Sequence, residues 1–114
     1  EALPVVEICA PGGWYGFDAK YTAGKTQYVF PDGPDDQALA DRCRRLALES
    51  FRAAGCRGMG RVDFRVTLAG EPFVLEINTV PGFTATSLLP KAAARRGIAF
   101  PDLCAAILEA ARCG

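Results

Sequence analysis

Two runs of alternating apolar and polar residues carry the side chains best suited to do chemistry in this sequence. The runs span residues 60–68 and 72–78, and the polar side chains on them are Arg61, Asp63, Glu76 and Asn78. Strict alternation predicts two strands, one directing Val62, Phe64 and Val66 inward and the other directing Phe73, Leu75 and Ile77 inward. A turn centred between Ala69 and Gly70 then joins the strands into a hairpin.

This hairpin pairs Asp63 with Glu76 and Arg61 with Asn78, and all four side chains point to one side. Directly opposed side chains have Cβ atoms about 4.5–5.5 Å apart, and like charges at that distance destabilise a sheet. A hard divalent cation such as Mg²⁺ removes the repulsion, because it prefers oxygen ligands and completes its shell with water or phosphate. The pattern therefore predicts a magnesium site, with a carboxylate-bridged pair of ions as one form of it.

Arg61 on the same face is suited to hold a phosphate oxygen, which is the arrangement that phosphoryl transfer needs. The alternative is an ordinary hairpin with a solvated polar face, and we assign Arg65 to that class.

Two further segments favour a ligand site. Residues 79–87, rich in Pro, Gly and hydroxyl side chains, lead from Asn78 into a helix expected over 88–96, whose N-terminus favours an anion such as a carboxylate. Ser87 stands at that N-terminus, where a simple N-cap role is the alternative. Lys20 and Tyr21 offer a cation for phosphate and an aromatic ring over a ligand, whereas Trp14 is equally suited to a core.

The remaining elements position these groups. Strands are expected within residues 3–9 and 26–30, and a helix from Asp35 to Gly55 presents an apolar face to the sheet. A last helix over 101–112 is expected to bury Leu103, Cys104, Ile107, Leu108 and Ala111. Residues 1–114 are thus predicted to form one α+β domain, a mostly antiparallel sheet flanked by helices.

Composition excludes several classes of function. Thirteen Lys and Arg balance 13 Asp and Glu, and His is absent, so there is no basic field for nucleic acid and no His-based nucleophile system. No apolar run is long enough to span a membrane, and no signal-peptide pattern is present. Five widely spaced Cys without a Cys-x-x-Cys pair indicate reduced thiols and a cytoplasmic protein. Because the sequence starts at Glu1 without Met, we expect it to be part of a longer polypeptide.

Three motifs closely resemble the D-alanine–D-alanine ligase family of ATP-grasp enzymes. They are Gly-Arg-Val-Asp-Phe at 60–64, Leu-Glu-Ile-Asn-Thr at 75–79, and Pro-Gly-Phe-Thr-Ala-Thr-Ser-Leu-Leu-Pro-Lys-Ala-Ala at 81–93. The resemblance extends over nearly the whole chain, including Ala-Lys-Tyr at 19–21. It implies the C-terminal subdomain of the ATP-grasp fold, with the family's N-terminal and central domains absent from this chain.

The resemblance also implies residue roles. Asp63, Glu76 and Asn78 would bind two Mg²⁺ or Mn²⁺ ions that bridge ATP phosphates, with Glu76 also counted in the nucleotide site, and Arg61 would stabilise the transferring phosphoryl group. Gly82 would bind the reacting acyl oxygen through its backbone N–H. Ser87 and Leu88 would receive the carboxylate of the second D-alanine. Lys20 would bind phosphate, Tyr21 would close over the site, and Trp14 would contact the nucleotide base.

By the same resemblance, ATP and D-alanine are the substrates, and the dipeptide forms through an acyl phosphate to supply peptidoglycan synthesis in a homodimeric protein. The isolated chain is expected to be inactive. D-Lactate or D-serine as second substrate stays open, as do another ATP-grasp carboxylate–amine ligase and a non-catalytic, nucleotide-binding remnant of the fold.

Overall fold

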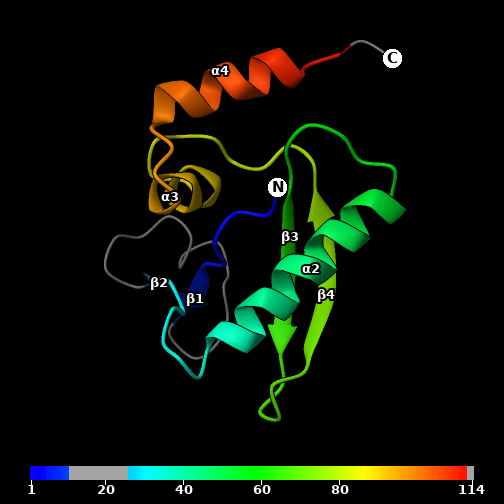
Figure 1. Cartoon of the computed structure of the whole chain (residues 1–114), viewed down its shortest axis with the longest axis vertical. Helices are drawn as coiled ribbons and strands as arrows, with labels where there is room; N and C mark the ends of the chain where they lie inside the picture. Colours follow the sequence, from blue (N-terminus) through cyan, green and yellow to red (C-terminus); the bar gives the residue numbers. More distant parts are fainter. Residues whose placement is uncertain (11–25, 113–114) are drawn as a thin grey trace.

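The computed structural model describes residues 1–10 and 26–112 of the chain. In these residues two antiparallel two-stranded sheets combine with three helices, which confirms the predicted α+β class. Figure 1 shows the longest helix lying across the larger hairpin, the last helix at the top of the view, and the helix before it lying beside the smaller sheet. No helix in the described ranges is long and apolar enough to cross a bilayer.

The smaller sheet joins β1 (Glu7–Cys9) to β2 (Gln27–Val29), with Ile8 opposite Tyr28. Both strands lie within the predicted segments and are shorter than expected. Two cations from α3 (Leu88–Arg95) rest on aromatic rings of the second segment: Lys91 Nζ lies 5.1 Å from the ring centre of Tyr28, and Arg95 lies 5.4 Å from that of Phe30. These contacts fix the smaller sheet against α3.

Helix α2 (Gln37–Ala53) covers one face of the larger hairpin (Figure 1). Its apolar stripe buries Ala40 and Cys43 and leaves Phe51 half-buried beside the hairpin. Gly55, at φ +69°, ends the helix, because the left-handed conformation lets the Cys56 N–H donate to the carbonyl of Phe51 at 3.0 Å. The predicted helix is therefore confirmed to within two residues at its start.

The larger hairpin pairs β3 (Arg61–Val66) with β4 (Pro72–Asn78). Opposite Arg61 lies Asn78, and opposite Asp63 lies Glu76, which are the pairs predicted from the turn position. The register then shifts by one residue, so that Phe64 faces Val74 and Val66 faces Pro72. A β-bulge at Leu75 accounts for this shift, since two residues of β4 span one interval of β3.

The bulge makes the predicted inward set of β4 wrong at two positions. A one-residue slip turns the following side chains to the other face, so Val74 takes the face of Phe64 while Phe73 and Leu75 are 59% and 61% exposed. The turn is also displaced from its predicted centre: the Thr67 N–H donates to the Glu71 carbonyl at 2.9 Å.

Helix α4 (Phe100–Ala110) buries less than its pattern predicts. Leu103 is buried as expected, but Leu108 is 74% exposed and Ala111 is exposed too. The reason is that α4 crosses α3 and contacts it over part of its length, while the rest of α4 projects from the described part of the molecule (Figure 1). An apolar stripe identifies a helix face, whereas burial also requires a neighbour to cover it.

Gly60 is required where α2 approaches the start of β3. A Cβ at this position would lie 2.6 Å from Phe51 Cε2 and 3.3 Å from the carbonyl oxygen of Asn78. We expect Gly60→Ala to lower the free energy of unfolding by about 1–3 kcal/mol, the usual cost of overpacking. Urea denaturation of the complete gene product measures this, with Gly33→Ala as control, because the new Cβ there meets only the flexible carboxylate of Asp36. Equal stability of the two variants would contradict the packing argument.

Cys43 is the buried thiol of α2. Burial raises the pKa of this thiol, and the charge of neighbouring Arg42 opposes the shift in part. The stabilisation from burying the neutral thiol is therefore fully present below the ordinary thiol pKa of about 8.5 and is lost as pH rises through the higher folded value. We expect iodoacetamide at about pH 8.5 to modify exposed Cys9 faster than Cys43, by mass spectrometry, and to modify both alike in denaturant.

Candidate active site

A charged cluster lies where β3 begins and β4 ends. Arg61 Nε donates to Asp63 Oδ1 at 2.6 Å and Arg61 Nη2 to Asp63 Oδ2 at 3.0 Å, while Nη2 lies 3.7 Å from Glu76 Oε1. The side chains of Arg61 and Asp63 are 27% and 33% exposed, so their attraction is less screened than that of a fully exposed pair. One guanidinium thus holds two opposed carboxylates on the outer face of the hairpin.

Asn78 completes the cluster and starts the following loop. Its Oδ1 accepts a hydrogen bond from the Val80 N–H at 3.0 Å, which fixes the direction of the amide oxygen and retains a second lone pair. Within residues 1–10 and 26–112, no three His, Cys, Asp or Glu side chains come together as metal ligands. The candidate oxygen donors are the two carboxylates of Asp63 and Glu76 and the amide oxygen of Asn78, and such hard donors fit Mg²⁺ or Mn²⁺.

The loop after β4 forms its own hydrogen-bonded turn before α3. The Thr84 N–H donates to Ser87 Oγ at 2.9 Å, and the Ser87 N–H donates to the Thr84 carbonyl at 3.0 Å. Ser87 occupies the N-cap position of α3, but its hydroxyl makes no capping bond to the helix. The simple N-cap role for this side chain is therefore wrong, because the hydroxyl turns back to Thr84.

The other predicted loop residues lie around this turn. A Cβ on Gly82 would be 3.8 Å from Ser87 Oγ, which places the backbone of Gly82 beside that hydroxyl. Leu88 is half-buried as the first residue of α3. The structure thus brings Gly82, Ser87 and Leu88 together at one helix start, next along the chain from the charged cluster. Trp14, Lys20 and Tyr21 lie outside the described residues, and their roles stay predictions.

The sequence interpretation missed Lys91 as a support of this loop. Its Nζ donates to the carbonyl of Thr86 at 2.7 Å while lying over the ring of Tyr28. Lys91 therefore ties the loop to the smaller sheet. Its spacing of four residues from Ser87 places it one helical turn on, and this spacing is the signal that was available in the sequence.

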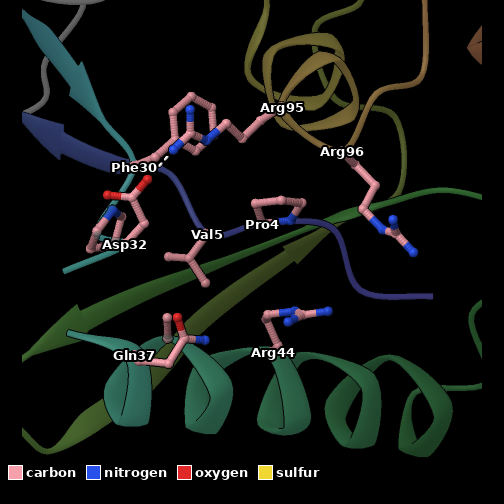
Figure 2. A pocket seen from close by; sticks show the side chains of 10 residues that line it. Pro4, Val5, Phe30, Asp32, Gln37, Arg44, Arg95 and Arg96 are labelled. Carbon is pink, nitrogen blue, oxygen red and sulfur yellow. Dashed lines mark hydrogen bonds and ion pairs between the residues drawn. The ribbon is translucent and has the colours of Figure 1, made fainter. Parts of the chain in front are cut away.

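A separate cavity of about 410 Å³ lies between the N-terminal segment, α2 and α3 (Figure 2). Its three cations are already engaged: Arg95 pairs with Asp32, Arg96 Nε lies 3.4 Å from Glu1 Oε2, and Arg44 donates to the Ala2 carbonyl at 3.1 Å. None of the predicted site residues within the described ranges lines it. This cavity is therefore distinct from the candidate site.

Comparison with known proteins agrees with the geometry. Residues 1–109 match the profile of the family described as D-ala D-ala ligase C-terminus. The chain is 48% identical to the D-alanine–D-alanine ligase of Pelotomaculum thermopropionicum over 99% of this chain and 36% of the relative. It is 49% identical to that of Janthinobacterium sp. (strain Marseille), over 100% and 36% respectively. The chain thus spans about a third of the length of these relatives.

Solved structures give the same answer. The crystal structure of the D-alanine–D-alanine ligase from Bacillus anthracis superposes with a TM-score of 0.75 at 34% identity, over 95% of this chain and 34% of that one. The same enzyme complexed with ATP superposes with a TM-score of 0.74 over 95% and 35%. With sequence profile, relatives and fold in agreement, the chain belongs to the family of D-alanine–D-alanine ligase C-terminal domains.

Proposed function

We propose that this chain is the C-terminal catalytic segment of an ATP-dependent ligase that joins two D-alanine molecules into D-alanyl-D-alanine through an acyl phosphate. The observation that carries the proposal is the opposed pair Asp63 and Glu76, held by Arg61 at the end of the hairpin from which the Ser87 loop departs. Membership of the ligase family supplies the reaction, and the geometry supplies the groups that such a reaction needs.

Asp63, Glu76 and Asn78 are the residues that would hold two Mg²⁺ or Mn²⁺ ions. When bound, such ions neutralise the phosphate charges of ATP and draw electron density from the phosphorus under attack. Arg61 presents a planar guanidinium beside them, suited to the equatorial oxygens of the transferring phosphoryl group, where negative charge is spread in the transition state. Arg61 therefore acts on charge, without taking up or releasing a proton.

The loop before α3 is proposed to bind the organic substrates. Ser87 and the first N–H groups of α3 face the carboxylate of the second D-alanine, since both the hydroxyl and the helix N-terminus stabilise an anion. Leu88 lies at that carboxylate. The backbone N–H of Gly82, beside Ser87, is placed to stabilise the oxygen that gains charge when the amine attacks the acyl phosphate.

Three residues outside the described ranges are assigned by family resemblance alone. Lys20 contacts ATP phosphate, Tyr21 closes over the site and Trp14 lies near the nucleotide base. We further propose that the N-terminal and central domains of the family complete the site in a homodimeric, cytoplasmic protein that supplies peptidoglycan synthesis. On this proposal, the 114-residue chain alone does not turn over.

The test is phosphate release from ATP and Mg²⁺ with and without D-alanine, comparing this chain with the complete gene product. D-Alanine-dependent release by the complete product alone is the expected result, with the dipeptide identified by mass spectrometry. D-Lactate and D-serine, supplied together with D-alanine, test the alternative second substrates. Absence of release with every acid tested would overturn the ligase proposal and favour a non-catalytic domain.

A further inference from the structure

Four polar contacts hold the loop before α3, and two of them join hydroxyl side chains. Besides the two backbone bonds of the turn, Thr84 Oγ1 lies 2.9 Å from Ser87 Oγ and 3.4 Å from Thr86 Oγ1. At its other end this loop is held by Lys91, whose ammonium binds the Thr86 carbonyl. The Ser87 hydroxyl is therefore the end of a short chain of hydroxyl groups.

The direction of the hydrogen bond between Thr84 and Ser87 decides what Ser87 offers to a ligand. A hydroxyl group has one proton to donate and two lone pairs to accept with. The Thr84 N–H already occupies one lone pair of Ser87 Oγ. If Ser87 donates its proton to Thr84 Oγ1, only a lone pair faces outward. If Thr84 donates instead, both lone pairs of Ser87 are used and its proton is directed outward.

A carboxylate only accepts hydrogen bonds, so it selects the second arrangement. We propose that Thr84 is a positioning residue: its hydroxyl donates to Ser87 Oγ and thereby turns the Ser87 proton toward the carboxylate of the second D-alanine. This inference rests on the proposed function and assigns to Thr84 the recognition of the acceptor's carboxylate through Ser87.

The surrounding contacts favour the same direction. Ser87 Oγ accepts no N–H from the first turn of α3, so its second lone pair is available to the Thr84 hydroxyl. Thr84 Oγ1 has two neighbouring hydroxyls, of which Ser87 is nearer by 0.5 Å, the difference between 3.4 Å and 2.9 Å. In the proposed arrangement Thr84 donates to Ser87 and Ser87 donates to the ligand, whereas the 3.4 Å contact with Thr86 is longer than an ordinary hydroxyl hydrogen bond. Hydrogen bonds that run in one direction polarise each other, which strengthens the last donor.

The experiment compares Thr84→Val with Thr84→Ser in the complete gene product. Valine keeps the size and the backbone N–H but removes the hydroxyl, whereas serine keeps the hydroxyl. We expect Thr84→Val to raise the KM for the second D-alanine about threefold, because Ser87 keeps its proton but loses the hydroxyl donor that orients and polarises it, with the KM for ATP unchanged. Thr84→Ser is expected to keep the wild-type KM for the second D-alanine. Thr67→Val, in the distant hairpin turn, is the matched control.

A second acceptor separates recognition of the carboxylate from a general effect on the loop. D-Alaninamide has the same amine but a neutral amide in place of the carboxylate, a weaker acceptor for the Ser87 proton, so Thr84→Val is expected to reduce its coupling to D-alanine less than it reduces coupling of the second D-alanine. An equal loss with D-alanine and D-alaninamide would overturn the inference, as would an unchanged KM for the second D-alanine. An inactive wild-type protein would instead overturn the proposed function, so the two failures are distinguishable.

Discussion

Replacing Asp63 by Asn in the complete gene product is expected to reduce D-alanine-dependent dipeptide formation by about 10³-fold. Asn keeps the shape of the side chain but removes the charge that faces Glu76 across the hairpin. The stabilisation that a bound divalent ion gives to a transition state amounts to several kcal/mol, and each ~1.4 kcal/mol corresponds to a factor of ten in rate. Losing the ion's carboxylate partner therefore removes most of the rate.

The measurement is coupled phosphate release at saturating ATP, together with titration of Mn²⁺ followed by electron paramagnetic resonance. Weakened Mn²⁺ binding is expected to accompany the lost turnover. Asp35→Asn is the matched control, because this exposed carboxyl precedes α2, away from the hairpin cluster. Undiminished turnover by Asp63→Asn would contradict the assignment of Asp63 as a metal ligand. A lower melting temperature with unchanged Mn²⁺ binding would indicate a structural role for this residue.

Sequence patterns predicted the part of the hairpin that carries the cluster because alternation there is unambiguous. From Arg61 to Asp63 and from Glu76 to Asn78, polar and apolar residues strictly alternate, so the four polar side chains share one face, and the predicted turn pairs them. Nearer the turn, β4 contains three consecutive apolar residues, Phe73, Val74 and Leu75, so the strict alternation predicted for this strand fails there. In such a run any of the three side chains could face inward, so the sequence pattern does not reveal the bulge.

The loop and α4 were predicted in position but not in contacts. An N-cap residue is identified from its place before a helix, yet its hydroxyl has several local partners, and Ser87 bonds to Thr84 instead of the helix. On α4, the spacing correctly predicts a helix containing Leu103 and Leu108, while the covering of each residue depends on elements far along the chain. Periodicity specifies an element, and tertiary packing decides which of its faces are buried.

Replacing Arg61 by Met is expected to lower kcat by about 10³-fold with little change in the KM for D-alanine. An arginine that contacts a transferring phosphoryl group acts mainly in the transition state and contributes 10³ or more in rate in related chemistry. Arg65→Met is the matched control: it removes a cation from the same face of β3, four residues further along the strand.

Metal affinity distinguishes the role of Arg61 from that of Asp63. In the structure Arg61 compensates both carboxylates, being bonded to Asp63 and 3.7 Å from Glu76. Removing the guanidinium leaves two opposed negative charges, whose repulsion a divalent cation relieves, so Mn²⁺ binding by Arg61→Met is expected to be retained or strengthened while turnover falls. Loss of metal binding in both variants would show that Arg61 holds the carboxylates in place. Loss of Mn²⁺ binding in Asp63→Asn alone would assign the metal to the Asp63 carboxylate and the phosphoryl group to the Arg61 guanidinium. The reason is that removing a negative charge weakens cation binding, whereas removing a positive charge from the same site does not.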